Sequence, residues 1–244
     1  MAAPRHLSPG RSAQVEDLII RRRHRLVRRL SPQRGGRLLD FGCGNGAQTR
    51  LFAADHDEVL GVDVAGAPID ELKAWAAATG NAGRVDAEFY DGRRLPCADA
   101  SMDAAISFEV LEHVADEAAA LAELARVLKP GGVLAISVPN RWWIFETHGA
   151  ALPLLPWNRV PFFSWLPTRL HDRWARARIY RRRQLVAKLR ALGFEILAAR
   201  YITAPMDVAP WQWLRAVLRA TAFRGDTTPI PCLATAVLVI ARRP

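Results

Sequence analysis

The sequence predicts an α/β fold in which a mostly parallel sheet is covered by helices on both faces. Short apolar segments alternate with helical ones from about residue 37 to residue 140, and turn residues separate them. Strands that alternate with helices at this spacing indicate a parallel sheet with two covered faces. A chain of 244 residues suits one such domain with an elaboration.

Hydrophobic periodicity and breaker residues define each expected element. The expected strands are 37–41, 58–64, 85–90, 102–108, 133–138, 194–202 and 235–241. The expected helices are 14–30, 47–54, 69–78, about 111–128, 184–192 and about 210–223. The run Lys129-Pro130-Gly131-Gly132 is expected to end the fourth helix before the fifth strand begins.

Composition divides the chain into four segments. Residues 1–36 form a basic N-terminal helical extension, 37–140 a ligand-binding core, and 184–244 complete the sheet. Residues 141–183 form an insertion rich in Trp, Arg and Pro, which is long enough to be functional. Its tryptophans are Trp142, Trp143, Trp157, Trp165 and Trp174.

The net charge of +10 comes from two of these segments. Residues 1–37 carry ten Arg against two acidic residues, and residues 141–183 carry nine Arg against two. Such patches bind nucleic acid or anionic lipid, or they are simply solvated faces. Three scattered cysteines, no signal peptide and no apolar run of membrane-spanning length predict a cytoplasmic protein.

The first expected strand leads directly into the glycine loop Asp40-Phe41-Gly42-Cys43-Gly44-Asn45-Gly46. Glycines in this position permit a tight turn and let a ligand approach the backbone. The loop alone also fits a dinucleotide pattern, and Asp63 closes the second strand where a carboxylate would bind ribose hydroxyls in either case. Asp40 favours a cofactor that carries an ammonium and a sulfonium over one with a pyrophosphate.

The motifs that follow carry a family resemblance. They are Asp91-Gly92-x-x-Leu95-Pro96, Glu109-Val110-Leu111-Glu112-His113-Val114, and Arg126-Val127-Leu128-Lys129-Pro130-Gly131-Gly132. With the glycine loop, they resemble the class I S-adenosylmethionine-dependent methyltransferases of the ubiquinone- and menaquinone-biosynthesis type. The resemblance spans about residues 38–140, and it implies a Rossmann-like sheet of seven strands, the last antiparallel.

The resemblance also assigns cofactor contacts. It implies that Asp40, Gly42 and Gly44 hold the methionine part of S-adenosylmethionine, and that Asp63 holds the ribose. Asp91, beside Gly92, would meet the adenine amino group, and Phe108 and Glu109 would lie near the methionine end. The full set of expected cofactor contacts is Asp40, Gly42, Cys43, Gly44, Gly46, Asp63, Val64, Asp91, Gly92, Phe108 and Glu109.

Methyl transfer from a sulfonium mainly requires alignment of donor and acceptor and exclusion of water. A base is needed only where the acceptor carries a proton, as a hydroxyl does. His113, after the fourth strand, and His148, beyond the fifth, are the candidate bases, with His171 less favoured. Each also has a structural interpretation. No group of residues has metal-ligand spacing, which predicts metal independence.

The insertion at 141–183 is expected to form the acceptor pocket or a lid. It favours a small-molecule or lipid-like acceptor, with O-methylation slightly preferred and peripheral contact with an anionic membrane through Arg-rich segments. A glycan pocket and a purely structural flap are further interpretations of its aromatic residues. The alternatives to this function are a nucleic-acid methyltransferase, an NAD-dependent oxidoreductase and an inactive binding protein with the same fold.

Overall fold

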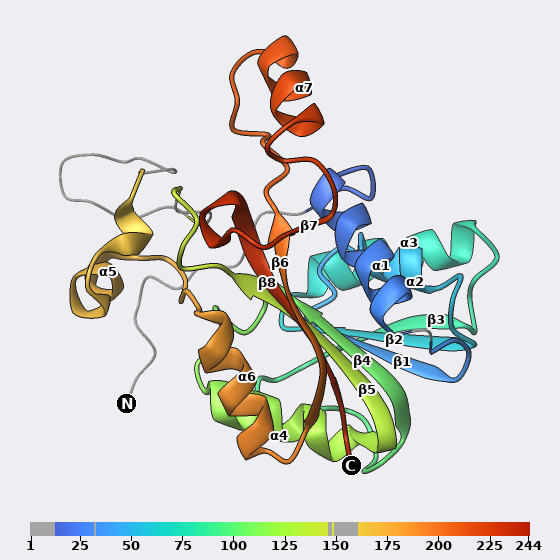
Figure 1. Cartoon of the computed structure of the whole chain (residues 1–244). Coiled ribbons are helices and arrows are strands. Elements are labelled where there is room, and N and C mark those ends of the chain that lie inside the picture. Colours follow the sequence, from blue (N-terminus) through green and yellow to red (C-terminus); the bar gives the residue numbers. More distant parts are fainter. Residues whose placement is uncertain (1–12, 32, 146–147, 149–160) are drawn as a thin grey trace.

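Figure 1 shows a twisted central sheet in a computed structural model, with helices on both faces and α5 and α7 standing away from it. The structure describes residues 13–31, 33–145, 148 and 161–244. Trp157 of the insertion and the arginines before residue 13 therefore lie outside the described residues.

The sheet has the predicted architecture with one strand more than expected. Its order is β3-β2-β1-β4-β5-β8-β6-β7. The strands are β1 (Arg37–Phe41), β2 (Glu58–Asp63), β3 (Val85–Phe89), β4 (Met102–Phe108), β5 (Leu128–Pro139), β6 (Glu195–Thr203), β7 (Thr227–Thr228) and β8 (Ala234–Arg242). β1 to β5 pair in parallel, and β8 runs antiparallel to both β5 and β6. The additional strand, β7, pairs only with Tyr201 and Ile202 at the sheet edge.

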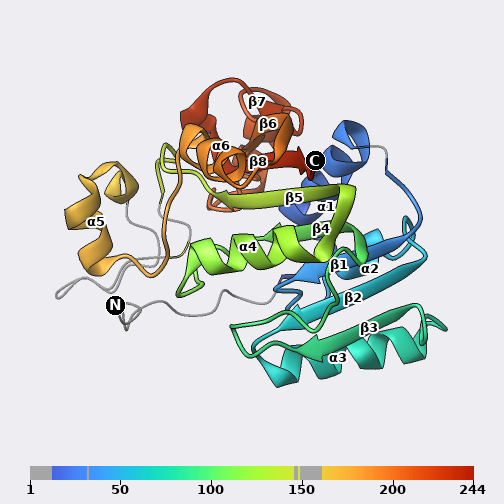
Figure 2. The ribbon, with the colours of Figure 1, turned by 90° about the horizontal axis from the view of Figure 1, so that it is seen from below.

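Helices cover the two faces of the sheet in separate layers. The α-helices are α1 (Leu18–Leu30), α2 (Thr49–Phe52), α3 (Gly66–Ala78), α4 (Glu117–Val127), α5 (Thr168–Trp174), α6 (Arg182–Ala191) and α7 (Gln212–Ala220), with short 3-10 helices η1 (Phe163–Trp165) and η2 (Pro231–Leu233). One apolar core joins α1, α2 and α3 to the sheet, and a second joins α4 and α6 to its opposite face (Figure 2).

Alternation along the strands explains how one sheet builds two cores. Leu38 packs into the α1–α3 core, and its neighbour Leu39 packs into the α4–α6 core, because successive side chains of a strand point to opposite faces. β4 is buried along nearly its whole length. This burial is expected of a parallel strand that has helices on both sides.

Several element boundaries differ from the sequence predictions, and α1 begins at Leu18 rather than at residue 14. α4 begins at Glu117 rather than near residue 111, because Asp116 caps it by accepting a hydrogen bond from the backbone N–H of Ala119 at 3.0 Å. The predicted helix 47–54 shortens to α2. β5 begins at Leu128, directly after α4, so the Lys129–Gly132 run lies within the strand rather than before it.

Two arginines of α1 do not belong to the exposed basic patch that the sequence suggested. Arg22 and Arg23 are buried. Arg22 donates hydrogen bonds to the carbonyl oxygens of Thr203 and Ala204, at 2.6 and 3.0 Å, at the end of β6. The N-terminal helix is therefore fixed to the sheet by its own charges, and two of the three arginines in the run 21–23 are not available to nucleic acid.

Within the described ranges, the structure contains no helix that is both long enough and apolar enough to cross a membrane.

Candidate functional site

The glycine loop between β1 and α2 lies at the carboxyl edge of the parallel strands, where ligands of such sheets bind. Gly42 has a φ of 78°, and its N–H donates to the carbonyl of Val62 at 2.8 Å. A side-chain Cβ on Gly42 would lie 2.2 Å from Cγ2 of Val110. Glycine is therefore required at this position, and the loop is pressed against the turn that follows β4.

Asp63 joins the end of β2 to this loop. One carboxylate oxygen accepts a hydrogen bond from the N–H of Gly44 at 2.8 Å, and the other accepts one from Ala65 at 3.1 Å. A Cβ on Gly44 would have no heavy atom within 4 Å, and Val64 is 58% exposed. The edge at Gly44 and Val64 is therefore open, and each oxygen of Asp63 retains capacity to accept a further hydrogen bond.

Asp40 lies beneath the loop and is only 2% exposed. The hydroxyl of Thr49 donates a hydrogen bond of 2.6 Å to its carboxylate. Burial raises the pKa of Asp40 to about 7, with the negative charge of Asp63 contributing in the same direction. A cation bound nearby would favour the ionised carboxylate, so this position is electrostatically suited to a positively charged ligand.

Cys43 and Gly46 complete the loop and pack against the protein interior. Cys43 is buried, and burial raises the pKa of its thiol well above the usual range. A Cβ on Gly46 would lie 2.5 Å from Cδ1 of Leu72 in α3. Both residues thus support the shape of the loop.

Asp91 and Gly92 form an exposed turn after β3. The Asp91 carboxylate accepts hydrogen bonds from the N–H groups of Arg93 and Arg94, at 2.8 and 3.2 Å, which lower its pKa. Gly92 takes a φ of 81°. Asp91 therefore has the geometry of a turn residue. Its side chain remains accessible at the same edge of the sheet as Asp63.

Phe108 ends β4 and Glu109 follows it, and Arg23 of α1 contacts both residues. Arg23 approaches Glu109 with its Nη2 2.8 Å from the carboxylate Oε1, and its guanidinium lies 5.8 Å from the centre of the Phe108 ring. Its Nε also donates to the hydroxyl of Ser137 in β5 at 3.2 Å. Glu109 has a φ of 59°, a left-handed conformation that is uncommon for this residue type.

The two candidate histidines come together, although His148 lies in the insertion and His113 follows β4. Their ring centres are 4.9 Å apart with an edge-on orientation. Glu112 lies beside them, fully buried, with its Oε1 3.5 Å from Nε2 of His148. His171 is elsewhere, in α5, where it contacts Asp172 at 3.0 Å and Phe163.

Burial determines the electrostatics of this Glu112–His113–His148 cluster. Neither ring nitrogen of His113 has a hydrogen-bond partner, and burial together with the charge of His148 lowers the pKa of His113 to about 4. The pKa of Glu112 is raised well above its ordinary value by burial and by the charge of Glu109. Among the described residues, Glu112 and His113 therefore present buried polar atoms with which a bound ligand could form hydrogen bonds.

The same three residues are the one group, among those that the structure describes, that could hold a metal ion. Their donor atoms all lie within 4.8 Å of one another. The ligand atoms of a zinc ion each lie about 2.0–2.1 Å from the metal, so they lie closer to one another than 4.8 Å. These side chains would therefore have to come closer together to bind zinc. Sequence spacing could not reveal this group, because His148 is far along the chain from the other two. Metal independence remains a prediction.

Sequence reasoning missed Arg23 and Glu112. Arg23 was counted within a basic run, and nothing in that run distinguishes an inward arginine from a solvated one. Glu112 belongs to the motif that carried the family resemblance, but its complete burial depends on packing between distant segments. The available signal in the sequence was that Glu112 lies directly between the apolar residue Leu111 and the candidate base His113.

Comparison with known proteins identifies the family. A family model for a methyltransferase domain matches residues 39–136. A ubiquinone biosynthesis O-methyltransferase from Azorhizobium caulinodans is 31% identical over 195 residues, which cover 80% of this chain and 73% of that protein. The chain belongs to the S-adenosylmethionine-dependent methyltransferase family.

Other similarities of this chain to known proteins are partial or structural. An Aspergillus nomiae O-methyltransferase, rstn1, is 38% identical over 130 residues, covering 53% of this chain and 58% of that protein. The chain spans about half the length of several curated relatives that it matches. A solved geranyl diphosphate methyltransferase in complex with SAM shares the fold, with a TM-score of 0.61 and 18% identity over 92% of this chain and 85% of that one.

The residues of the loop fit the family's cofactor. S-adenosylmethionine carries an ammonium and a sulfonium, and the buried Asp40 would be stabilised in its ionised form by either. The open edge at Gly44 leaves room for a ligand, and the remaining acceptor capacity of Asp63 suits a vicinal diol.

We expect the Asp63→Ala substitution to weaken binding of S-adenosylhomocysteine by roughly 1.5–3 kcal/mol, the scale of hydrogen bonds to a charged group. The N–H of Gly44 also loses its partner, so part of the effect will come from the loop. Isothermal titration calorimetry measures the change. Glu88→Ala, at an exposed position of β3, is the matched control and should leave the affinity unchanged. Equal affinities for all three proteins would show that the ribose binds elsewhere.

Proposed function

We propose that this chain is an O-methyltransferase that acts on a small-molecule or lipid-like acceptor, with S-adenosylmethionine as the methyl donor. The observation that carries the proposal is the Glu112–His113–His148 cluster, which supplies a base next to the glycine loop. A base is useful when the acceptor is a hydroxyl and unnecessary when it is a free amine. The O-methyltransferases among the similar proteins support the same choice.

Backbone contacts connect the cluster to the cofactor loop. Val110 lies against Gly42, and the N–H of His113 donates to the carbonyl of Val110 at 2.9 Å. The turn that carries Glu112 and His113 is thus held directly beside the loop. An acceptor hydroxyl bound to the cluster would lie near the edge at which the donor binds, which is the positioning that methyl transfer requires.

Within the cluster we propose His148 as the base, ahead of His113. The bound cofactor supplies an activated methyl group, so the protein has only to orient the acceptor hydroxyl and take up its proton. Glu112 lies close enough to His148 to stabilise an imidazolium. His113 is neutral at pH 7, because its pKa is about 4, and it accepts a hydrogen bond from the acceptor rather than its proton. The proposal needs no metal ion.

The test begins with a screen of lipid, quinone, glycan and RNA fractions using labelled S-adenosylmethionine. We expect a hydroxylated small-molecule or lipid fraction to take up label, and a chelator to leave the rate unchanged. With that acceptor, His148→Asn should lower kcat by about 10²–10⁴-fold, the usual contribution of a general base, and His113→Asn by less.

Glu112→Gln removes the carboxyl group whose Oε1 lies 3.5 Å from Nε2 of His148. It should lower kcat more than it changes KM, because an amide cannot balance the positive charge that His148 gains when it takes up the proton. An unchanged kcat in this variant, with His148→Asn fully active, would contradict the assignment of the base. Label taken up only by RNA would contradict the acceptor class.

We also propose a cytoplasmic protein that contacts anionic membranes, through α7 rather than through the Arg-rich segments. Trp211 and Trp213 are 59% and 64% exposed, and their rings stack with centres 5.9 Å apart. No residue of α7 is buried, and the helix projects from the sheet in Figure 1. Exposed indoles on an amphipathic helix are suited to the interface of a bilayer.

Vesicle sedimentation tests this contact. The double variant Trp211→Ala/Trp213→Ala should partition about tenfold or more weakly into phosphatidylcholine vesicles that contain phosphatidylglycerol, because the apolar face of α7 is lost. Phe89→Ala, which removes an exposed aromatic residue from β3, should partition like the unmodified protein. Equal partitioning of all three proteins would exclude α7 as the membrane contact.

A further inference from the structure

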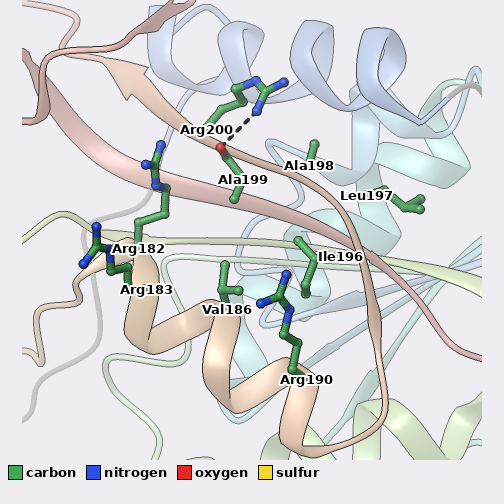
Figure 3. Close-up of a pocket in the computed structure, with 9 residues that line it drawn as sticks. All are labelled: Arg182, Arg183, Val186, Arg190, Ile196, Leu197, Ala198, Ala199 and Arg200. Carbon is green, nitrogen blue, oxygen red and sulfur yellow. Dashed lines mark hydrogen bonds between the residues drawn. The ribbon is translucent and has the colours of Figure 1, made fainter.

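A groove of about 410 Å³ lies between α6 and β6, far along the sheet from the glycine loop (Figure 3). Every charged side chain that lines it is an arginine. Three come from α6 (Arg182, Arg183 and Arg190) and one comes from β6 (Arg200). Val186 and Ile196 provide an apolar surface between them. The groove is therefore apolar at its base and strongly positive around its rim.

One wall of the groove is an open sheet edge. β6 pairs with β8 on one side from Glu195 to Thr203. On the other side, its pairing among the described residues is limited to β7, at Tyr201 and Ile202. The stretch Glu195–Arg200 thus has a free edge, and its outward peptide groups can pair with another extended chain.

The arginines at this edge are not neutralised by the protein itself. Within the part of the chain that the structure describes, the side chains of Arg183 and Arg190 form no ion pair or hydrogen bond. Arg182 lies over the ring of Tyr201, 4.7 Å from its centre, and Arg200 donates to the carbonyl of Ala199 at 3.2 Å. Neither contact removes positive charge, so the rim attracts an anionic partner.

We propose that this edge binds an extended acidic segment of a partner protein, which adds to β6 as a further strand. The outward backbone groups of residues 195–200 supply main-chain pairing, with the segment displacing the Arg200 guanidinium from the carbonyl of Ala199, and Arg183 and Arg190 receive acidic side chains. An apolar side chain of the segment fits over Val186 and Ile196. Single-stranded nucleic acid would need exposed aromatic faces for its bases, and no aromatic residue is among the described residues that line the groove. The ring of Tyr201, next to Arg200 in the sequence, is buried beneath Arg182.

Fluorescence anisotropy tests the proposal with the full-length protein and a labelled synthetic peptide in which glutamate and valine alternate. The Arg183→Glu/Arg190→Glu variant should bind it about tenfold or more weakly, because two attractions become repulsions. The control is Arg21→Glu/Arg29→Glu, an equal charge change at exposed positions of α1, which should bind like the unmodified protein. The same peptide with lysine in place of glutamate should not bind.

Amide hydrogen exchange distinguishes strand addition from simple charge attraction. The bound peptide should slow exchange within residues 195–200 and leave methyl transfer unchanged, since the groove lies outside the proposed active site. The proposal would be overturned by equal loss of binding in both charge-reversed variants, by no slowing at these amides, or by RNA or anionic vesicles binding at Arg183 and Arg190 where the peptide does not. If none of these probes binds, the arginines serve only to protect the open edge from pairing, and the proposal is overturned as well.

Discussion

The contact of Arg23 with Glu109 joins three parts of the molecule on which the proposed site depends. It ties α1 to the end of β4 with an N–O distance of 2.8 Å, and through Ser137 it reaches β5. Arg23 is buried, so loss of its partner would leave an uncompensated charge. The left-handed backbone at Glu109 starts the turn that carries Glu112 and His113. A helix outside the sequence motifs therefore helps to position the proposed catalytic cluster.

The proposed site separates into a cofactor part built from local sequence and an acceptor part built from distant segments. The loop residues and Asp63 lie within two consecutive βα units, and their hydrogen bonds follow from the turn geometry. The Glu112–His113–His148 cluster forms only when the insertion packs against the turn after β4. Donor binding can stay constant in such an arrangement while the insertion changes the acceptor.

This separation explains what could be predicted from the sequence. Apolar strands that alternate with helices predicted the sheet and its parallel core, because those patterns report local burial, and the family resemblance implied the antiparallel last strand. The start of α4 was wrong by about two turns, although Asp116 followed by Glu117 is a capping signal. The inward direction of Arg22 and Arg23, the burial of Glu112 and its contact with His148 could not be read, because they depend on tertiary packing and not on residue order.

The central claim is that the edge formed by Asp40, Gly44 and Asp63 binds S-adenosylmethionine and not a dinucleotide. Isothermal titration calorimetry with S-adenosylhomocysteine and with NAD tests it most directly. The account predicts stoichiometric binding of S-adenosylhomocysteine, no measurable binding of NAD, and competition between S-adenosylmethionine and S-adenosylhomocysteine for one site. Binding of NAD without binding of S-adenosylhomocysteine would contradict it.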